Sequence, residues 1–288
     1  MNNLFEDGRT PLFIPAGRNI AVTYPEQFKL DFYGNLRSDL IRGEGNSAKP
    51  QSVDLHLMIK FLERTERIKD RFKQNDFGSL VTDKFSREDR TNEQLLSLVR
   101  KKIDEILKGE YRQDQFGEKI FYDTRNYVNL NETSSGQQEV IRILQDIFLI
   151  LLDEENAFRV IEEPEAHLYP AAQKQLVEMI ALMLNNSNSQ VVLTTHSPYI
   201  LSVFNNLLFA TRVVRKNKNV SEEISQIIPE TCWLNPDKCN AYFLKDGFCE
   251  SIFDVQTGLI GQNYLDEISE DLGADFDYLY HIHGRSFK

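Results

Sequence analysis

From residue 137 onward the chain alternates between helical patterns and short, almost continuously apolar strands. The pattern runs through a helix at 137–153, a strand ending at 161–165, a helix at 170–184, a strand at 190–195 and a helix after Pro198. Strands that are apolar on both faces and separated by helices are typical of a parallel sheet covered on both sides. We therefore expect an α/β fold with a largely parallel sheet and flanking helices.

A second region, residues 35–115, has a different character and predicts a helical insertion. Apolar residues recur at helical spacing over 53–73 and again over 91–108, and Gly109 is the expected C-cap of the second helix. The polar stretch between them, 74–90, predicts a loop.

The remaining segments predict strands and turns. Pro15 and Gly17 interrupt short apolar runs over 11–32, and two strand candidates follow at 119–122 and 127–130. The tail, 210–288, predicts a few strands, a hairpin around Asp246-Gly247 and a short final helix.

Composition and charge narrow the classes of protein. No run of 18 or more apolar residues occurs, and residues 1–9 lack an apolar signal core, so we expect a cytoplasmic protein without a membrane-spanning helix. The net charge of −11 argues against binding DNA alone, because phosphate contacts require a basic surplus. Cys232, Cys239 and Cys249 lack the close pairing of a zinc site and are expected to be reduced.

A polar motif, Thr133-Ser134-Ser135-Gly136-Gln137-Gln138-Glu139, leads into the helix expected at 137–153. Ser135 and Gln138 fit a capping box, which would make the motif simply a good helix start. A helix N-terminus led by two serines and a glycine also presents unpaired N–H groups and a positive dipole end to an anion. Both interpretations remain open from these residues alone.

The second motif ends a strand on adjacent carboxylates, in Ile161-Glu162-Glu163-Pro164-Glu165. Strand side chains alternate between faces, so Glu162 and Glu163 are expected to point in different directions, one toward a Mg²⁺ and one toward a water. The alternative is a pair of surface acids at a strand end.

The third motif, Thr194-Thr195-His196-Ser197-Pro198, ends the next apolar strand. Ligand sites in open α/β sheets lie beyond the carboxyl ends of the strands, where Glu163 and His196 are both expected. A single histidine at a strand end is also often structural or merely solvated.

In this order and spacing, the three motifs resemble those of the ABC-type ATPase family, in the branch with SMC and RecF-like clamps and the AAA-labelled ATPases of bacterial anti-phage systems. The string SSGQQ resembles the ABC signature loop, IEEPEAHLYP resembles Walker B with the D-loop, and TTHSP resembles the switch-histidine loop. FIPAGR and DYLYHI also resemble this branch, so the likeness covers nearly the whole chain after residue 10.

The resemblance implies a role for each motif, with ATP and Mg²⁺ as cofactors. Ser134, Ser135, Gly136 and Gln137 would bind nucleotide, with Ser135 and Gly136 at the γ-phosphate of an ATP held by the opposite lobe. Glu162, in place of the usual Walker B aspartate, would support Mg²⁺ through water. Glu163 would polarise the attacking water, and His196 would contact the γ-phosphate or that water. Residues 165–167 would form the D-loop at the seam between lobes.

The phosphate-binding P-loop, GxxxxGK[ST], is missing, because no Gly-Lys dipeptide occurs in the 288 residues. The stretch from Gly43 to Lys49 has the wrong spacing, follows no apolar strand and precedes Pro50. We therefore expect either a split ATPase or a fragment of a longer protein. In both cases the P-loop comes from another ATPase polypeptide or a second lobe, and the chain alone neither binds ATP tightly nor hydrolyses it.

The resemblance also implies a domain layout: 1–34 as a remnant of N-terminal ATPase strands, 35–115 as the insertion, 116–215 as the ATPase core and 216–288 completing the lobe. The leading hypothesis is an ATPase subunit of an anti-phage or DNA-maintenance complex, with an effector subunit and DNA reached through the complex. The alternative is a non-catalytic regulatory lobe that donates its signature loop to a partner. A nuclease is disfavoured, because the acids after His196 lack the expected setting.

Overall fold

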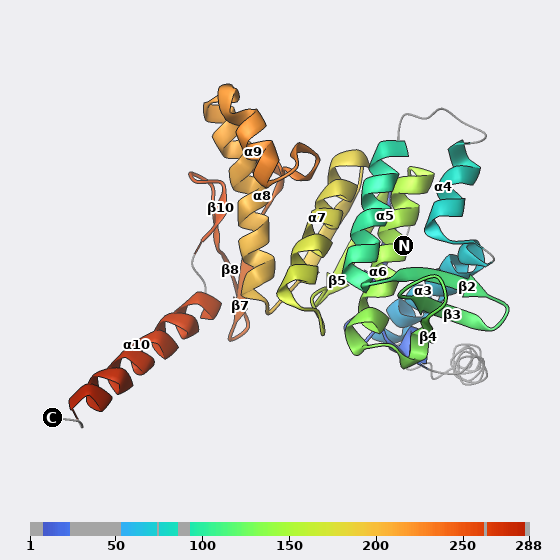
Figure 1. The fold of residues 1–288 in the computed structure, drawn as a ribbon. Coiled ribbons are helices and arrows are strands. Elements are labelled where there is room, and N and C mark those ends of the chain that lie inside the picture. The colour runs from blue at the N-terminus through green and yellow to red at the C-terminus, as the bar shows by residue number, and fades with distance from the viewer. Residues whose placement is uncertain (1–7, 24–52, 74, 86–92, 262–263, 286–288) are drawn as a thin grey trace, which may run out of the picture. The chain divides into compact units, whose positions relative to one another are not determined.

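The computed structural model describes residues 8–23, 53–73, 75–85, 93–261 and 264–285 (Figure 1). The chain divides into two compact units, residues 1–195 and 196–288, and each is described by itself. The second half of the strands and turns expected over 11–32, residues 24–32, and the glycine-bearing stretch 43–49 lie outside the described residues. Within the part that is described, no helix is long and apolar enough to cross a membrane.

A three-stranded parallel sheet forms the centre of the first unit. Its strands are β1 (Thr10–Ile14), β5 (Ala157–Glu162) and β6 (Gln190–Thr194), in the order β1-β5-β6. Ile14 pairs with Ile161, and Glu162 pairs with Thr194, so the carboxyl ends of all three strands lie at one edge. The predicted α/β fold with a parallel sheet and flanking helices is confirmed.

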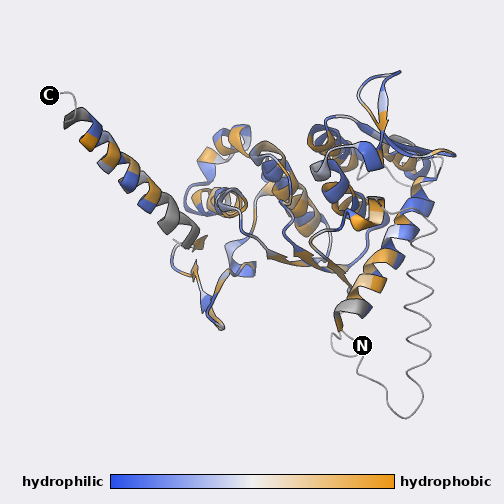
Figure 2. Cartoon of the chain, turned by 90° about the horizontal axis from the view of Figure 1, so that it is seen from below, coloured by the Kyte–Doolittle hydropathy of each residue, from blue (hydrophilic) through white to orange (hydrophobic). Residues whose placement is uncertain are grey.

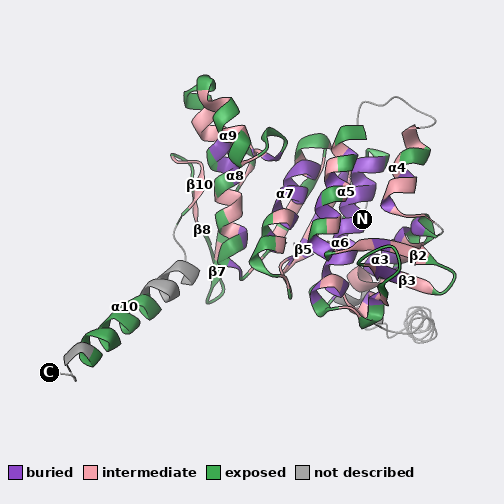
Figure 3. Cartoon of the chain, in the orientation of Figure 1, coloured by how far each residue is buried: buried purple, intermediate pink, exposed green. Residues whose placement is uncertain are grey.

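Three helices, α5 (Glu93–Leu107), α6 (Ser135–Asp153) and α7 (Pro170–Asn186), pack against one another in the first unit. Figure 3 shows how much of α6 is buried, and every residue from Gln138 to Leu152 is buried. The apolar sequence of α6 explains this position, because a helix that is hydrophobic on most of its circumference must be enclosed.

The buried charges of this core are paired. Arg142 of α6 donates twice to Glu118, at 2.7 Å each, and Arg159 of β5 contacts Asp146 of α6 at 2.6 Å. Burial alone raises the pKa of Glu118, but the charge and hydrogen bonds of Arg142 outweigh it and bring that pKa down to about 2. Pairing of this kind is what makes charged groups tolerable in a core.

A helical and β-sheet layer completes the first unit. It contains α1 (Ile20–Thr23), α3 (Val53–Phe72), α4 (Phe77–Phe85), and an antiparallel sheet of β2 (Glu110–Asp114), β3 (Gly117–Phe121) and β4 (Tyr127–Asn129), followed by the 3-10 turn η2 (Leu130–Glu132). Helix α3 contacts both β1 and α6. Rings of Phe72, Phe77, Tyr111 and Phe148 pack edge-to-face or tilted, which joins this layer to the core.

Two expectations for the first unit are wrong. The polar stretch 74–90 is not simply a loop, because α4 forms within it: the Asp76 carboxylate accepts from Ser79 N at 2.7 Å, and the Ser79 hydroxyl accepts from Asp76 N at 2.8 Å. This reciprocal cap starts a helix that buries Phe77 and Leu80. At the end of α5, Lys108 and not Gly109 adopts the left-handed conformation, with φ 53°.

The second unit consists of helices and small antiparallel sheets. Its elements are α8 (Pro198–Lys216), η3 (Lys218–Val220), α9 (Ser221–Ile227), η4 (Glu230–Cys232), η5 (Pro236–Lys238), β7 (Tyr242–Lys245), β8 (Phe248–Ser251), β9 (Phe253–Asp254), β10 (Leu259–Ile260) and α10 (Tyr264–Arg285). The hairpin predicted at Asp246-Gly247 is confirmed, because both residues have positive φ between β7 and β8. Helix α10 has 22 residues and is not the short helix expected; hydrophobic and hydrophilic residues alternate along it (Figure 2).

Candidate functional site

The two adjacent glutamates occupy different backbone environments at the end of β5. Glu162 is the last strand residue, whereas Glu163 has left the strand with φ 41°. The Glu163 N–H still donates to the Thr194 carbonyl at 2.9 Å, which keeps the turn beside the end of β6. Ala166 N then donates to the Glu163 carbonyl at 3.0 Å and closes the turn. Strand alternation therefore cannot orient Glu163, because the chain turns there. We call residues 162–165 the acidic turn.

Each carboxylate of the acidic turn is half-buried, and hydrogen bonds of Glu162 and Glu165 link the turn to neighbouring segments. Glu162 Oε2 accepts from the backbone N–H of Ala16 at 3.1 Å, which joins it to the segment after β1. Glu165 Oε1 accepts from the Thr195 hydroxyl at 2.6 Å. The acidic turn is thus tied to the segments that follow both neighbouring strands.

The helix cap in the signature-like motif lies one residue earlier than expected. Ser134, and not Ser135, is the N-cap of α6: its hydroxyl accepts from Gln137 N at 3.4 Å, and Gln137 Oε1 accepts from Ser134 N at 3.2 Å. The amide of Gln138 instead donates to the carbonyls of Asn131 and Thr133. Ser135 is exposed in the first turn of α6 and takes no part in the cap.

Gln137 has a second structural contact. Its Nε2 donates to the Leu107 carbonyl at 2.5 Å, at the end of α5. The side chain therefore orients the start of α6 through both of its polar atoms. A nucleotide contact of Gln137, like those of Ser134, Ser135 and Gly136, stays a prediction.

Gly136 brings the start of α6 close to the D-loop-like residues. A Cβ at this position would lie 2.5 Å from the carbonyl oxygen of His167, nearer than side-chain carbons approach. Only glycine allows this approach without a backbone shift. The structure thereby places the signature-like helix start beside the segment that follows the acidic turn, both within the first unit.

Arg18 is a site residue for which the sequence predicts no role. It belongs to the FIPAGR string, four residues after β1, and its side chain is fully buried. Its guanidinium donates to carbonyls of the acidic turn and of α6. An arginine after an apolar strand and a Pro-Ala-Gly turn is the only signal in the sequence, and nothing local indicates what such a residue contacts.

His196 is the first residue of the second unit and is exposed. The next residue, Ser197, is the N-cap of α8, and its hydroxyl accepts from Ile200 N at 3.4 Å. The structure thus accounts for this motif partly as a helix start. A joint role for His196 and Glu163 stays a prediction.

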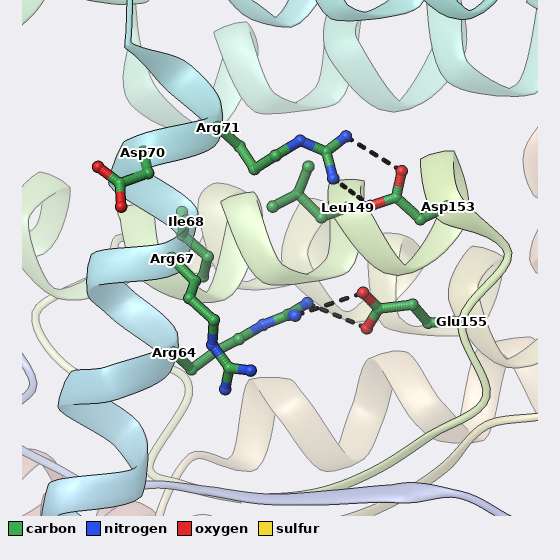
Figure 4. A pocket seen from close by; sticks show the side chains of 8 residues that line it. All are labelled: Arg64, Arg67, Ile68, Asp70, Arg71, Leu149, Asp153 and Glu155. Carbon is green, nitrogen blue, oxygen red and sulfur yellow. Dashed lines mark hydrogen bonds and ion pairs between the residues drawn. The ribbon is translucent and has the colours of Figure 1, made fainter.

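A polar hollow lies between α3 and the end of α6 (Figure 4) and has a volume of about 350 Å³. Its charged lining consists of three arginines and three carboxylates: Arg64, Arg67, Arg71, Asp70, Asp153 and Glu155. Arg64 contacts Glu155 and Arg71 contacts Asp153, so these charges are compensated within the chain. The hollow offers no charge surplus that would hold a phosphate.

The parallel sheet, the acidic turn at its carboxyl edge and the adjoining helix start are those of an ATPase-like α/β lobe. Residues 20–201 match the family model of the AAA ATPase domain, a match longer than half of the chain. The protein therefore belongs to the AAA ATPase domain family. It is also similar to an OLD nuclease of Thermus scotoductus (strain ATCC 700910 / SA-01), with 34% identity over 71 residues. That match covers 25% of this chain and only 13% of the relative.

Proposed function

We propose that this chain forms the acidic half of an ABC-type ATP-hydrolysing site, of the SMC and RecF-like branch, which takes its P-loop from outside these 288 residues. The observation that carries the proposal is the acidic turn: Glu162 and Glu163 at the carboxyl edge of a parallel sheet, with Gly136 of the signature-like loop packed against the carbonyl of His167. Membership of the AAA ATPase domain family supports nucleotide binding as the purpose of this edge.

The residues present are suited to the γ-phosphate end of a magnesium-bound nucleotide. One oxygen of Glu162 is held by Ala16 N, which fixes the orientation of a carboxylate that would bind a metal-bound water. Mg²⁺ usually retains several waters and takes one or two carboxylates together with the phosphates. When bound, the ion would neutralise the phosphate charge. Glu163, one residue beyond the strand, would orient and polarise the attacking water.

The same residues are not suited to binding the β-phosphate. That task needs consecutive backbone N–H groups and a lysine, and no GxxxxGK[ST] string occurs in the sequence. We therefore propose that a P-loop-bearing polypeptide, or a second ATPase lobe, completes the site. Ser135 and Gly136 would then meet the γ-phosphate of an ATP held across the seam.

ATP binding would close such lobes and hydrolysis would release them, through different affinities for the two states. We propose an effector subunit as the recipient of this motion, in an anti-phage or DNA-maintenance complex. DNA would be reached through the complex, because a chain of net charge −11 lacks the basic surplus for binding alone.

Glu163→Gln tests the catalytic role in the complex that co-purifies with the tagged chain and contains a P-loop polypeptide. We expect ATP turnover to fall by about 100-fold or more while ATP binding persists, because positioning and charge supply most of the catalysis. Glu154→Gln, at a largely exposed carboxylate beyond α6, is the matched control and should leave turnover unchanged.

Unchanged turnover in Glu163→Gln would instead favour the non-catalytic regulatory lobe, in which the signature-like loop serves a partner's ATP. Persistent absence of any P-loop polypeptide from the purified complex would contradict both assignments.

A further inference from the structure

The buried side chain of Arg18 joins three segments that lie far apart in the sequence. Its guanidinium donates to five backbone carbonyls. These are Glu139 O from Nε at 2.8 Å, Pro15 O and Glu162 O from Nη1 at 3.2 and 3.0 Å, and Glu163 O and Pro164 O from Nη2 at 3.1 and 3.3 Å. Three of the five carbonyls belong to the acidic turn, and one belongs to the second turn of α6.

The charge of Arg18 is compensated at the same place. Its Nε lies 3.7 Å from Oε2 of Glu139, whose side chain is also buried. Burial lowers the pKa of Arg18, and the nearby carboxylates of Glu139, Glu165 and Glu163 oppose that shift. The guanidinium remains protonated because its ordinary pKa is so high. The buried guanidinium therefore interacts with carboxylates of two segments: Glu163 and Glu165 of the acidic turn, and Glu139 of α6.

We propose that Arg18 is a positioning residue that fixes the backbone of the acidic turn and couples it to the signature-bearing helix α6. Five donors in one rigid plane can hold carbonyls from two elements at once, whereas the single ammonium of lysine cannot. Because Nε bonds α6 while Nη1 and Nη2 bond the turn, the two segments are held as one body. The proposal rests on the proposed function for its catalytic consequence, but the positioning itself is testable without ATP.

Hydrogen exchange of the full chain tests the positioning. In Arg18→Lys we expect the amides of residues 163–166, which include the N–H groups of Glu163 and Ala166 bonded in the turn, to exchange at least about tenfold faster, because local opening becomes easier. Arg142→Lys is the matched control: Arg142 is equally buried, lies on α6, the helix that Arg18 contacts, and bonds Glu118 instead of the turn. It should leave exchange in 163–166 unchanged.

Two results would overturn the proposal. One is wild-type exchange in residues 163–166 of Arg18→Lys. The other is equal acceleration in Arg142→Lys, which would indicate general loosening of the core. If Arg18→Lys does not fold, Glu139→Gln is examined instead, because loss of the counter-charge removes the ion pair that holds the guanidinium against α6 and should weaken its hold on the acidic turn. Faster exchange in 163–166 of that variant supports the coupling to α6, and unchanged exchange contradicts it.

In the ATP-hydrolysing complex, Arg18→Lys should lower kcat by about 10- to 100-fold with KM within about twofold, as expected for loss of a supporting residue that does not touch ATP. Arg142→Lys should retain kcat. A kcat unchanged by Arg18→Lys, where Glu163→Gln abolishes turnover, would refute the catalytic consequence. Turnover that persists in Glu163→Gln would refute the proposed function and leave the exchange result to decide the positioning.

Discussion

Asp104 of α5 is a carboxylate whose ionised form is disfavoured in the folded chain. Burial is the main cause that raises its pKa to about 6, and Glu110 and Asp76 add to the rise while Arg100 opposes it. Its Oδ1 is buried and has no hydrogen-bond partner among the described residues. Below about pH 4 the carboxyl is protonated in both folded and unfolded chains. Between about pH 4 and 6 only the unfolded chain ionises, so stability falls as pH rises through this window.

Asp104→Asn should therefore stabilise the chain at pH 7, by about 1 kcal/mol after allowing for solvent screening of a half-exposed group, and by nothing at pH 3.5. Urea unfolding at both pH values measures the difference. Asp70→Asn, at a carboxylate whose side chain is 71% exposed and faces Lys73, should change little at either pH. A stabilisation by Asp104→Asn that is the same at both pH values would contradict this account.

At the scale of the element, two adjacent serines at the start of α6 have different roles. Ser134 caps the helix through the amide of Gln137, whereas Ser135 is exposed beyond the cap. Ser134→Ala should cost about 1 kcal/mol of unfolding free energy, the usual value of an N-cap. Ser135→Ala should leave stability unchanged but lower ATP turnover in the assembled complex. Thermal unfolding and turnover of both variants separate the roles, and equal stability loss in the two would place the cap differently.

At the scale of the whole molecule, the first unit presents β6 as the last strand of its sheet among the described residues. Val192 of this strand is 48% exposed, and an open strand edge with apolar side chains favours association. We propose that a partner polypeptide or second lobe adds to the sheet at this edge.

The purified chain alone should accordingly bind ATP·Mg²⁺ with an affinity weaker than micromolar, because its sequence has no GxxxxGK[ST] string to supply a lysine and N–H cradle for the β-phosphate. Isothermal titration calorimetry measures this. Micromolar affinity would show that the 288 residues contain a complete nucleotide site.

We also expect the chain to associate with itself or with a partner, and light scattering that shows a monodisperse stable monomer would contradict that expectation.

Most elements could be predicted from the sequence, because periodicity and caps are local. The helix expected at 170–184 is α7, and the strand expected at 190–195 is β6. Helix α4 was missed because the polar residues on either side of it outweighed the Asp76-Ser79 cap, and burial of Phe77 decided the outcome. The candidate glutamates were identified for the same local reason: adjacent acids at a strand end are visible in the sequence.

The sequence by itself determined the alternation of helices and strands from residue 137 onward, the acidic strand end, the helix-start motif and the lack of a P-loop string. Only the tertiary structure decided that Arg18 meets the acidic turn and α6, and that Gly136 approaches the carbonyl of His167. The physical reason is separation along the chain: Arg18 and the carbonyls of Glu139 and Glu162 are 121 and 144 residues apart. Local patterns specify helices and strands, whereas a side chain's distant partners are set only when those elements pack.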